Sequence, residues 1–169
     1  MKQFKIGLQL YSVRDDIQKD LVGTLKAVKA MGYDYIESAG AGFYGLTADE
    51  AKALLAEIGL TLISAHTTDT SDENLALYQA LGVKNITIPY YAIGNYRNDF
   101  EGSLAYFKDA SEKVTKYGMR LFYHNHDFEF EVLGDKKLCH SPEGYAIGQA
   151  YEKMPRPALT HTNHHRQKQ

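Results

Sequence analysis

The feature of this chain that most constrains its fold is a repeated alternation of short apolar segments with longer amphipathic segments, from residue 4 to about residue 126. In the short segments apolar residues alternate with small or polar ones, which predicts strands, whereas apolar residues three or four apart in the longer segments predict helices. The predicted strands cover residues 4–13, 33–38, 60–66, 85–91 and 119–126, and the predicted helices cover residues 20–31, 47–59, 72–82 and 100–117. This regular order of strand, helix and strand predicts right-handed parallel βα units.

The ends of the predicted helices carry their own signals. Thr47 and Glu50 have the spacing of a capping box, which opens a helix that Gly59 ends. Most of the predicted helices stop at a glycine that is followed almost directly by an apolar strand. Such short connections favour parallel βα units over an α+β fold.

Five βα units fit two architectures: an open doubly wound sheet, or part of a (β/α)8 barrel. The first predicted strand is not followed by the G-x-G-x-x-G pattern, and the glycine-rich loop at residues 40–45 lacks the full pattern, so nucleotide binding is weakly supported. Polar residues at the carboxyl ends of several strands favour the barrel. We therefore predict an α/β fold, a partial (β/α)8 TIM barrel of about five parallel βα units followed by an irregular tail.

Four side chains that can bind ligands or move protons follow the carboxyl ends of predicted strands: Glu37, His66, His124 and His126. Because the carboxyl ends of parallel strands meet at one edge of the sheet, we expect Glu37, His66 and His124 to converge at one mouth. Each also has a structural alternative. A strand-end histidine is often a hydrogen-bonded part of the scaffold, and Glu37 could form a salt bridge or cap a helix across the mouth.

Charge and composition exclude several functions. The net charge of −2 offers no global field for nucleic acid or an anionic membrane. No window approaches the roughly 18 uninterrupted apolar residues of a membrane span, and the first residues lack the apolar core and cleavage site of a secretory signal. The single cysteine, Cys139, cannot form an internal disulfide. We expect a soluble cytoplasmic protein that binds neither nucleic acid nor membranes.

The composition changes near residue 134. Residues 135–169 carry six Lys/Arg against three Asp/Glu, whereas residues 1–134 carry 13 against 18. The later segment also holds three of the four prolines and shows no sustained apolar period, which is typical of irregular or disordered chain. We predict a barrel domain over residues 1–133 and an irregular tail over residues 134–169, a tail that a frame shift near codon 134 would produce.

Five segments, in order, carry a resemblance to a known family: GLQLYSVRDD from residue 7, MGYDYIE from residue 31, GLTLISAH from residue 59, LGVKNITIP from residue 81 and YHNHDFEF from residue 123. In this ordered set the chain resembles the sugar phosphate isomerase/epimerase family of xylose isomerase-like TIM barrels, from about Ile6 to Val132. The resemblance covers the N-terminal five βα units of such a barrel. It is specific for the family and not for a substrate.

The resemblance implies a divalent metal at the carboxyl mouth of the barrel. His124 matches the family position on the fifth strand that binds the metal, where imidazole suits Zn, Mn, Co or Fe, and Mg is a further candidate. Glu37 and His66 match positions that line the family's pocket, Glu37 as the candidate catalytic carboxylate and His66 as a substrate contact. His126 is a candidate contact to the substrate or to the ligand shell. Tyr90 could stack on a sugar ring, although a chain with 13 tyrosines places such a residue there by chance.

The implied activity is metal-dependent proton transfer at the carbon next to the carbonyl of a ketose or inosose. A complete barrel takes about 250 residues, and nothing after Val132 resembles its last three units, which supply further metal ligands and a base. We therefore expect this chain alone to be weakly active or inactive. The alternative is a non-catalytic half-barrel that pairs with a second copy or another chain through open sheet edges. The related nuclease chemistry is disfavoured by the acidic balance of residues 1–134.

Overall fold

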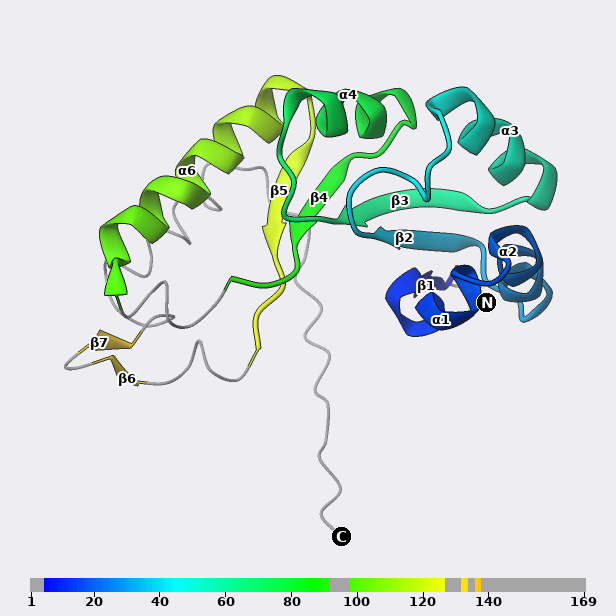
Figure 1. The fold of residues 1–169 in the computed structure, drawn as a ribbon, viewed down its shortest axis with the longest axis horizontal. Coiled ribbons are helices and arrows are strands. Elements are labelled where there is room, and N and C mark those ends of the chain that lie inside the picture. Colours follow the sequence, from blue (N-terminus) through cyan, green and yellow to red (C-terminus); the bar gives the residue numbers. More distant parts are fainter. Residues whose placement is uncertain (1–4, 92–97, 127–131, 134–135, 138–169) are drawn as a thin grey trace, which may run out of the picture.

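The sheet of this protein is a single row of five parallel strands in sequential order. The computed structural model describes residues 5–91, 98–126, 132–133 and 136–137. The strands are β1 (Gly7–Gln9), β2 (Tyr35–Ala39), β3 (Thr61–His66), β4 (Asn85–Ile88) and β5 (Arg120–Tyr123), hydrogen-bonded in the order β1-β2-β3-β4-β5 (Figure 1). This order confirms the predicted partial α/β barrel, because a doubly wound sheet would place the first strand inside the sheet.

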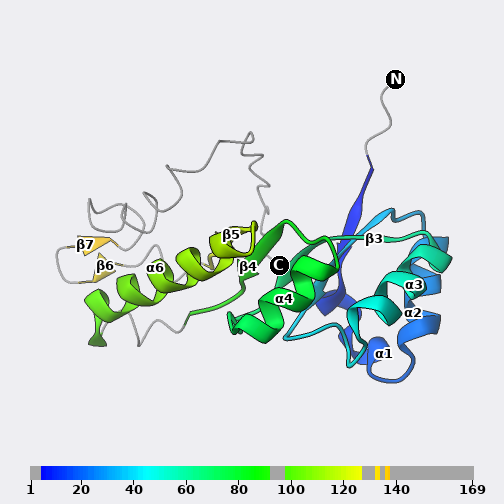
Figure 2. The ribbon, with the colours of Figure 1, turned by 90° about the horizontal axis from the view of Figure 1, so that it is seen from above.

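Helices connect the strands and lie along one side of the sheet (Figures 1 and 2). They are the 3-10 helix η1 (Leu10–Val13) and the α-helices α1 (Arg14–Ile17), α2 (Leu21–Ala30), α3 (Ala48–Ile58), α4 (Asp72–Ala80) and α6 (Phe100–Lys116). The predicted capping box is present: the Thr47 side chain accepts from the backbone N–H of Glu50, whose carboxylate accepts from the backbone N–H of Thr47. Gly59 ends α3 with φ of 80°, a left-handed conformation that glycine adopts without strain.

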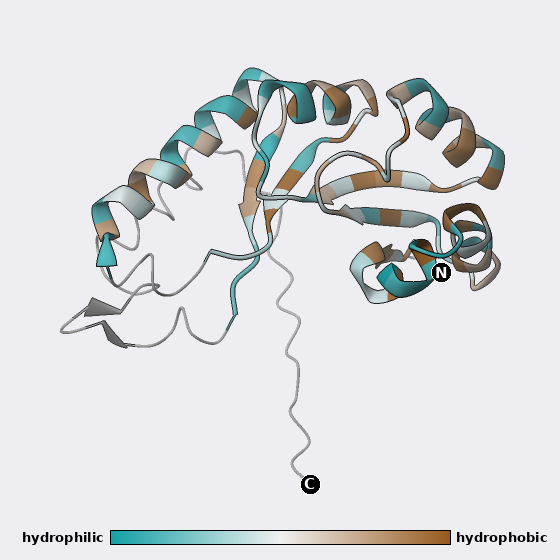
Figure 3. Cartoon of the chain, viewed as in Figure 1, coloured by the Kyte–Doolittle hydropathy of each residue, from teal (hydrophilic) through white to brown (hydrophobic). Residues whose placement is uncertain are grey.

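The hydrophobic core fills the space between the sheet and these helices. Residues on the helix side of the strands, such as Ile36, Ala65 and Ile86, are completely buried. They pack in one cluster with helix residues that include Leu25 of α2 and Val114 of α6. Figure 3 shows hydrophobic segments recurring along the strands. The other side of the sheet, the inner face of the partial barrel, carries the polar residues described below.

The predicted first strand, residues 4–13, is wrong in its second half. The strand ends at Gln9, and the chain turns at once into η1 and α1. The turn buries Leu10 and Ile17 in the core while Tyr11 stays 57% exposed, so the apolar residues of this segment follow a helical turn and not a strand. The predicted strand over residues 85–91 also ends early, at Ile88, because Pro89 has no N–H to continue the ladder.

Much of the predicted tail lies outside the described residues. Two short strands, β6 (Val132–Leu133) and β7 (Lys136–Lys137), pair antiparallel across the predicted domain boundary. The boundary at residues 133–134 and the irregular tail therefore stay predictions. Among the described residues, no helix is both long and apolar enough to cross a membrane.

Candidate functional site

The candidate site begins with a row of three polar side chains across the first three strands. The parallel register places Gln9 of β1 beside Glu37 of β2, and Glu37 beside Ser64 of β3. The Gln9 amide donates to Glu37 Oε1 at 3.0 Å, and the Ser64 hydroxyl donates to Glu37 Oε2. Both carboxylate oxygens are therefore held in place by side chains from neighbouring strands.

A β-bulge at Ile63 turns the end of β3 toward this row. Strict alternation after the buried Leu62 would put Ser64 and His66 on the helix side of the sheet. The pairing with β2 instead skips one residue, because Leu62 pairs with Ile36 and Ser64 pairs with Glu37. Bulges often re-aim side chains next to functional sites. Here the extra residue brings Ser64 and His66 to the face that carries Glu37.

Burial governs the electrostatics of Glu37. Its side chain is 23% exposed. Burial raises the pKa of the Glu37 carboxyl above its usual value, and the hydrogen bond from Gln9 opposes that shift. The carboxylate bonds to side chains from β1 and β3, so the structure does not use it as a helix cap. A carboxylate with a raised pKa is a stronger base than an exposed one, which suits proton transfer near neutral pH.

His66 completes a chain of contacts with Gln9 and Glu37. Its Nε2 atom lies 3.3 Å from Glu37 Oε1, and its Nδ1 atom lies 2.6 Å from the Gln9 amide nitrogen. Burial lowers the pKa of His66 to about 4, and the charge of His124 adds to that effect. His66 is thus neutral at pH 7. We assign the His66 proton to Nε2, which faces the Glu37 carboxylate; Nδ1 then accepts one of the two Gln9 amide hydrogens, and Glu37 accepts the other.

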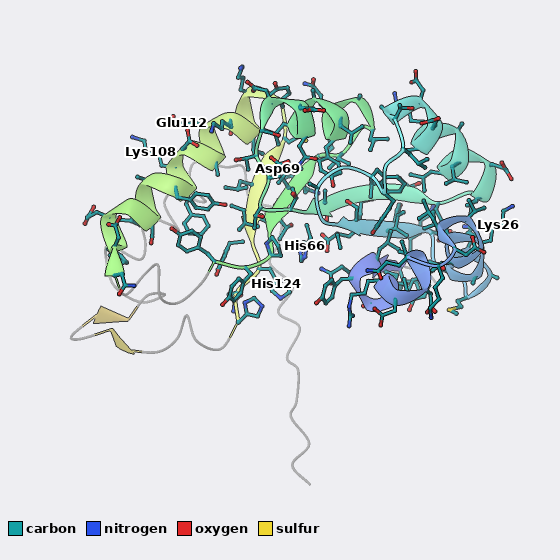
Figure 4. All side chains as sticks on the ribbon, viewed as in Figure 1. Lys26, His66, Asp69, Lys108, Glu112 and His124 are labelled. Atoms are coloured by element: carbon teal, nitrogen blue, oxygen red, sulfur yellow. The ribbon has the colours of Figure 1, made fainter. Side chains whose placement is uncertain are left out.

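Three more rings extend this contact chain along the carboxyl edge of the sheet. The rings of His66 and His124 lie 5.2 Å apart, as centroid distances, and those of His124 and His126 stack at 4.9 Å. Tyr90, which is 50% exposed, meets His126 edge-on at 5.6 Å. Figure 4 shows His66 and His124 side by side. The structure therefore brings all five residues named from the sequence into one connected row, although their roles stay predictions.

The described side chains do not by themselves fit a metal centre. Within residues 5–91 and 98–126, no three His, Cys, Asp or Glu side chains are grouped so that they could hold a metal ion. A catalytic metal typically needs about three protein ligands. The metal-ligand role of His124 therefore stays a prediction.

Two contributors to the site, Gln9 and Ser64, were not predicted from the sequence. Period-two alternation does place Gln9 opposite Leu8 and Leu10, and hence on the inner face. The prediction of a strand to residue 13 put Gln9 in mid-strand, far from the carboxyl edge. Ser64 carried no usable signal, since only the bulge at Ile63 brings it to Glu37.

Two solved structures similar to this chain are named sugar phosphate isomerase/epimerase. A sugar phosphate isomerase/epimerase from Parabacteroides distasonis ATCC 8503 matches with a TM-score of 0.64 and 25% identity over 88% of this chain and 60% of its own. A second structure of that description and organism matches with a TM-score of 0.63 and 26% identity over 89% and 65%. The chain thus spans less than two thirds of the length of either structure.

A more distant match shows the fold alone. It is a xylose isomerase-like TIM barrel protein from Mycobacterium smegmatis, solved in complex with magnesium, with a TM-score of 0.54 and 13% identity over 89% of this chain and 62% of its own. No family model matches the chain. No curated protein matches it significantly. The strand order and the structural matches together show that the five parallel strands of this chain and their connecting helices form part of a TIM-barrel fold, similar to that of the solved sugar phosphate isomerase/epimerase structures.

Proposed function

We propose that this chain provides part of the sugar-binding site of an isomerase or epimerase that moves a proton at the carbon next to a carbonyl. The observation that carries the proposal is the half-buried Glu37 carboxylate, fixed by Gln9 and Ser64 and in contact with neutral His66. The resemblance to two structures named sugar phosphate isomerase/epimerase supports the same reaction class.

The proposed chemistry uses Glu37 as the base. The proton on a carbon next to a ketone is only weakly acidic. Its removal therefore needs a well-placed base and stabilisation of the enolate that develops. Glu37 accepts the proton, and its raised pKa favours both accepting and returning it. Gln9 and Ser64 keep the carboxylate oriented, while His66 holds a proton on Nε2 at its edge. His124, His126 and Tyr90 form the wall along which the sugar lies.

A divalent metal belongs to this proposal only as an expectation. When bound, such an ion supplies Lewis-acid stabilisation to a carbonyl oxygen. His124 is the residue that the resemblance assigns to it, and a set of three ligands would need at least one from outside the described residues. We therefore expect the chain alone to bind a sugar weakly and to turn it over little or not at all.

Calorimetric titration with a panel of ketoses and inososes tests the proposal. Wild-type protein should bind at least one of them, and E37Q, which cannot accept the proton and keeps the shape, should bind it several-fold differently. E57Q is the matched control, because Glu57 is an exposed carboxylate paired with Lys26 at 3.5 Å. Identical binding by wild type and E37Q, or no binding to any member of the panel, would overturn the proposal.

The second candidate, a non-catalytic half-barrel that associates with a second copy, has its own observation. Among the described strands, β1 and β5 each have a neighbour on one side only. Ile63, on the bulge of β3, is 42% exposed. An edge with unpaired backbone groups can pair with another chain. Light scattering of wild type and I63K tests this candidate: a stable dimer that persists in I63K favours association through the sheet edges, a dimer that I63K disrupts favours association through the surface around Ile63, and a monomer in both excludes association.

A further inference from the structure

The geometry of the Glu37 site depends on the β-bulge in β3. Leu62 and Ala65 are both buried in the core although they are three residues apart, because the extra residue Ile63 lies between them. Packing fixes these two core residues, but it does not fix how the peptide group between Ile63 and Ser64 is rotated. That rotation decides the direction of the Ser64 side chain, and therefore whether its hydroxyl reaches Glu37.

Asn85, the first residue of β4, contacts this peptide group. Its Nδ2 atom donates to the Ile63 carbonyl oxygen at 3.3 Å. The register of β3 and β4 pairs Asn85 with Ser64, so both lie on the inner face, opposite to the completely buried Ala65. The Asn85 amide therefore lies beside the residue that donates to the candidate base.

The chemistry of the two groups determines the orientation of the Asn85 amide. A carbonyl oxygen only accepts hydrogen bonds, so the nitrogen of the amide, and not its oxygen, faces Ile63. The Oδ1 atom of Asn85 is then buried, and within the described part of the chain it has no hydrogen-bond partner. A buried acceptor without a partner destabilises a fold. Asparagine at this position therefore carries a cost that an apolar residue would avoid.

Asparagine is also an unfavourable residue for a strand. Strands favour β-branched and aromatic side chains, and the next residues of β4, Ile86 and Thr87, follow this preference. Natural sequences break such local rules mainly at functional sites, where another gain offsets the cost. Among the described residues, the hydrogen bond that the Asn85 side chain makes is the one to Ile63. We therefore look for the gain in what this bond does to the bulge.

The bond gives the peptide group after Ile63 a fixed direction. Ile63 is 42% exposed, so water is the alternative partner for its carbonyl group. A water molecule satisfies the carbonyl without restraining it, whereas Asn85 belongs to a strand that pairs with β3. The planar peptide bond joins the Ile63 carbonyl rigidly to the nitrogen and Cα atoms of Ser64. A restraint on this carbonyl therefore limits the rotation of Ser64 relative to Glu37.

We propose that Asn85 is a positioning residue of the site: its amide fixes the peptide group between Ile63 and Ser64, and thereby holds the Ser64 hydroxyl on the Glu37 carboxylate. The hydrogen bonds of Asn85 and Ser64 carry this inference. Its consequence for proton transfer rests on the proposed function, in which Glu37 is the base. Asn85 acts through Ser64 and is not itself a catalytic residue.

The pKa of the Glu37 carboxyl, measured from its ¹³C resonance in the full chain without a sugar, tests the proposal. The Ser64 hydroxyl donates to Glu37 and so favours the charged carboxylate, which means that S64A should raise this pKa. N85A should raise it as well. N85L, which fills the space of asparagine but has no donor, should raise it as N85A does. A pKa in N85L equal to that of the wild type would overturn the inference.

The double variant S64A/N85A tests the route from Asn85 to Glu37. If Asn85 acts through Ser64, N85A should leave the pKa of Glu37 unchanged once the Ser64 hydroxyl is absent. The ¹³C resonance of the Ile63 carbonyl should shift in both N85A and N85L, because the carbonyl loses its donor. An equal rise in pKa from N85A with and without the Ser64 hydroxyl would contradict this route.

Q79L is the matched control. Gln79, an exposed residue of α4, makes the same kind of bond, from its side-chain amide to the carbonyl oxygen of Tyr117 at 2.9 Å. Q79L removes this bond and should leave the pKa of Glu37 at its wild-type value. The amide spectrum of each variant reports its fold directly. Equal rises of the pKa in Q79L and N85L would overturn a specific role of Asn85.

Titration with a ketose separates this inference from the proposed function. The wild type and Q79L should bind the ketose equally, and S64A and N85L should bind it several-fold more weakly. Absence of ketose binding in the wild type, with the pKa of Glu37 raised in N85L, would support the positioning of Glu37 by Asn85 and overturn the proposed function. Ketose binding with an unchanged pKa in N85L would overturn the role of Asn85 and leave the proposed function standing.

Discussion

Glu37 Oε1 lies 3.3 Å from His66 Nε2, and the amide of Gln9, in β1, contacts both side chains. This arrangement places a carboxylate with a raised pKa against an imidazole with a lowered one. Burial raises the pKa of Glu37 and lowers that of His66, so it favours the uncharged form of each side chain. Because His66 is neutral at pH 7, its contact with Glu37 is a hydrogen bond and not an ion pair. Environments that perturb titratable groups in this way are typical of functional sites.

The lowered pKa of His66 predicts a loss of stability in acid. The unfolded chain binds a proton near pH 6.5, whereas folded His66 does so only near pH 4. Above pH 6.5 the free energy of unfolding should therefore be unaffected by His66. As the pH drops from 6.5 to 4 it should fall by about 3 kcal/mol at most, and below pH 4 this fall should stop. H66Q should lose this part of the pH dependence. Urea unfolding of both proteins between pH 7 and pH 4 measures it, and parallel curves would contradict the assignment.

Gln9 should matter for stability far more than its place in a short strand suggests. Q9L removes the donor that faces buried His66 Nδ1 and one of the donors to half-buried Glu37, at a cost of about 1–3 kcal/mol. Gln18 is exposed, so Q18L should change the free energy of unfolding by less than about 0.5 kcal/mol. Thermal and urea unfolding compare the two variants. Equal effects would mean that the Gln9 contacts are not formed.

The bulge in β3 predicts opposite outcomes for two neighbouring aliphatic residues. Leu62 belongs to the core and is 6% exposed, whereas Ile63 is 42% exposed. L62A should cost about 2–4 kcal/mol through lost burial and a cavity. I63A should cost less than about 1 kcal/mol. Urea unfolding of the two variants checks the register, and a larger cost for I63A would show that the strand lacks the bulge.

Tyr78 should anchor the loop that follows β2. Its hydroxyl, with a pKa raised by burial to about 12, joins Ser38 to the carbonyl groups of that loop. Y78F should cost about 1–3 kcal/mol and speed amide exchange in the loop. Y117F, which removes an exposed hydroxyl bonded to Asp72, is the control and should do neither. Unchanged exchange in Y78F would exclude this anchoring.

Turnover by the chain alone should be absent or very slow. The described residues lack a set of three metal ligands, and a missing general acid or base typically costs about 10²–10⁴-fold. Assays with Mn²⁺, Co²⁺ or Zn²⁺ against ketoses and inososes measure it. Robust metal-dependent turnover that H124A abolishes would contradict this prediction and show that the chain forms a complete site.

The sequence predicts the strand order of this fold, and it predicts the candidate site only in part. Five apolar segments with short connections determine a sequential parallel sheet, and Glu37 and His66 sit at strand ends that any such sheet brings together. The end of β1 and the bulge at Ile63 depend on packing: burial of Leu10 in a helical turn ends the strand, and pairing with β2 decides the register of β3. Both effects depend on residues far away in the sequence, so the local pattern of apolar residues does not reveal them. Gln9 and Ser64 were missed for this reason.

The most direct test of the sugar site is to follow the imidazole resonances of His66 and His124 by NMR during titration with a ketose or its phosphate ester. The sugar should shift both rings together, with smaller changes at distant surface residues, and E37Q should alter the shift at His66. Saturating sugar that leaves both rings unmoved, or that moves only residues remote from the carboxyl edge of the sheet, would contradict a sugar site at Glu37 and His66.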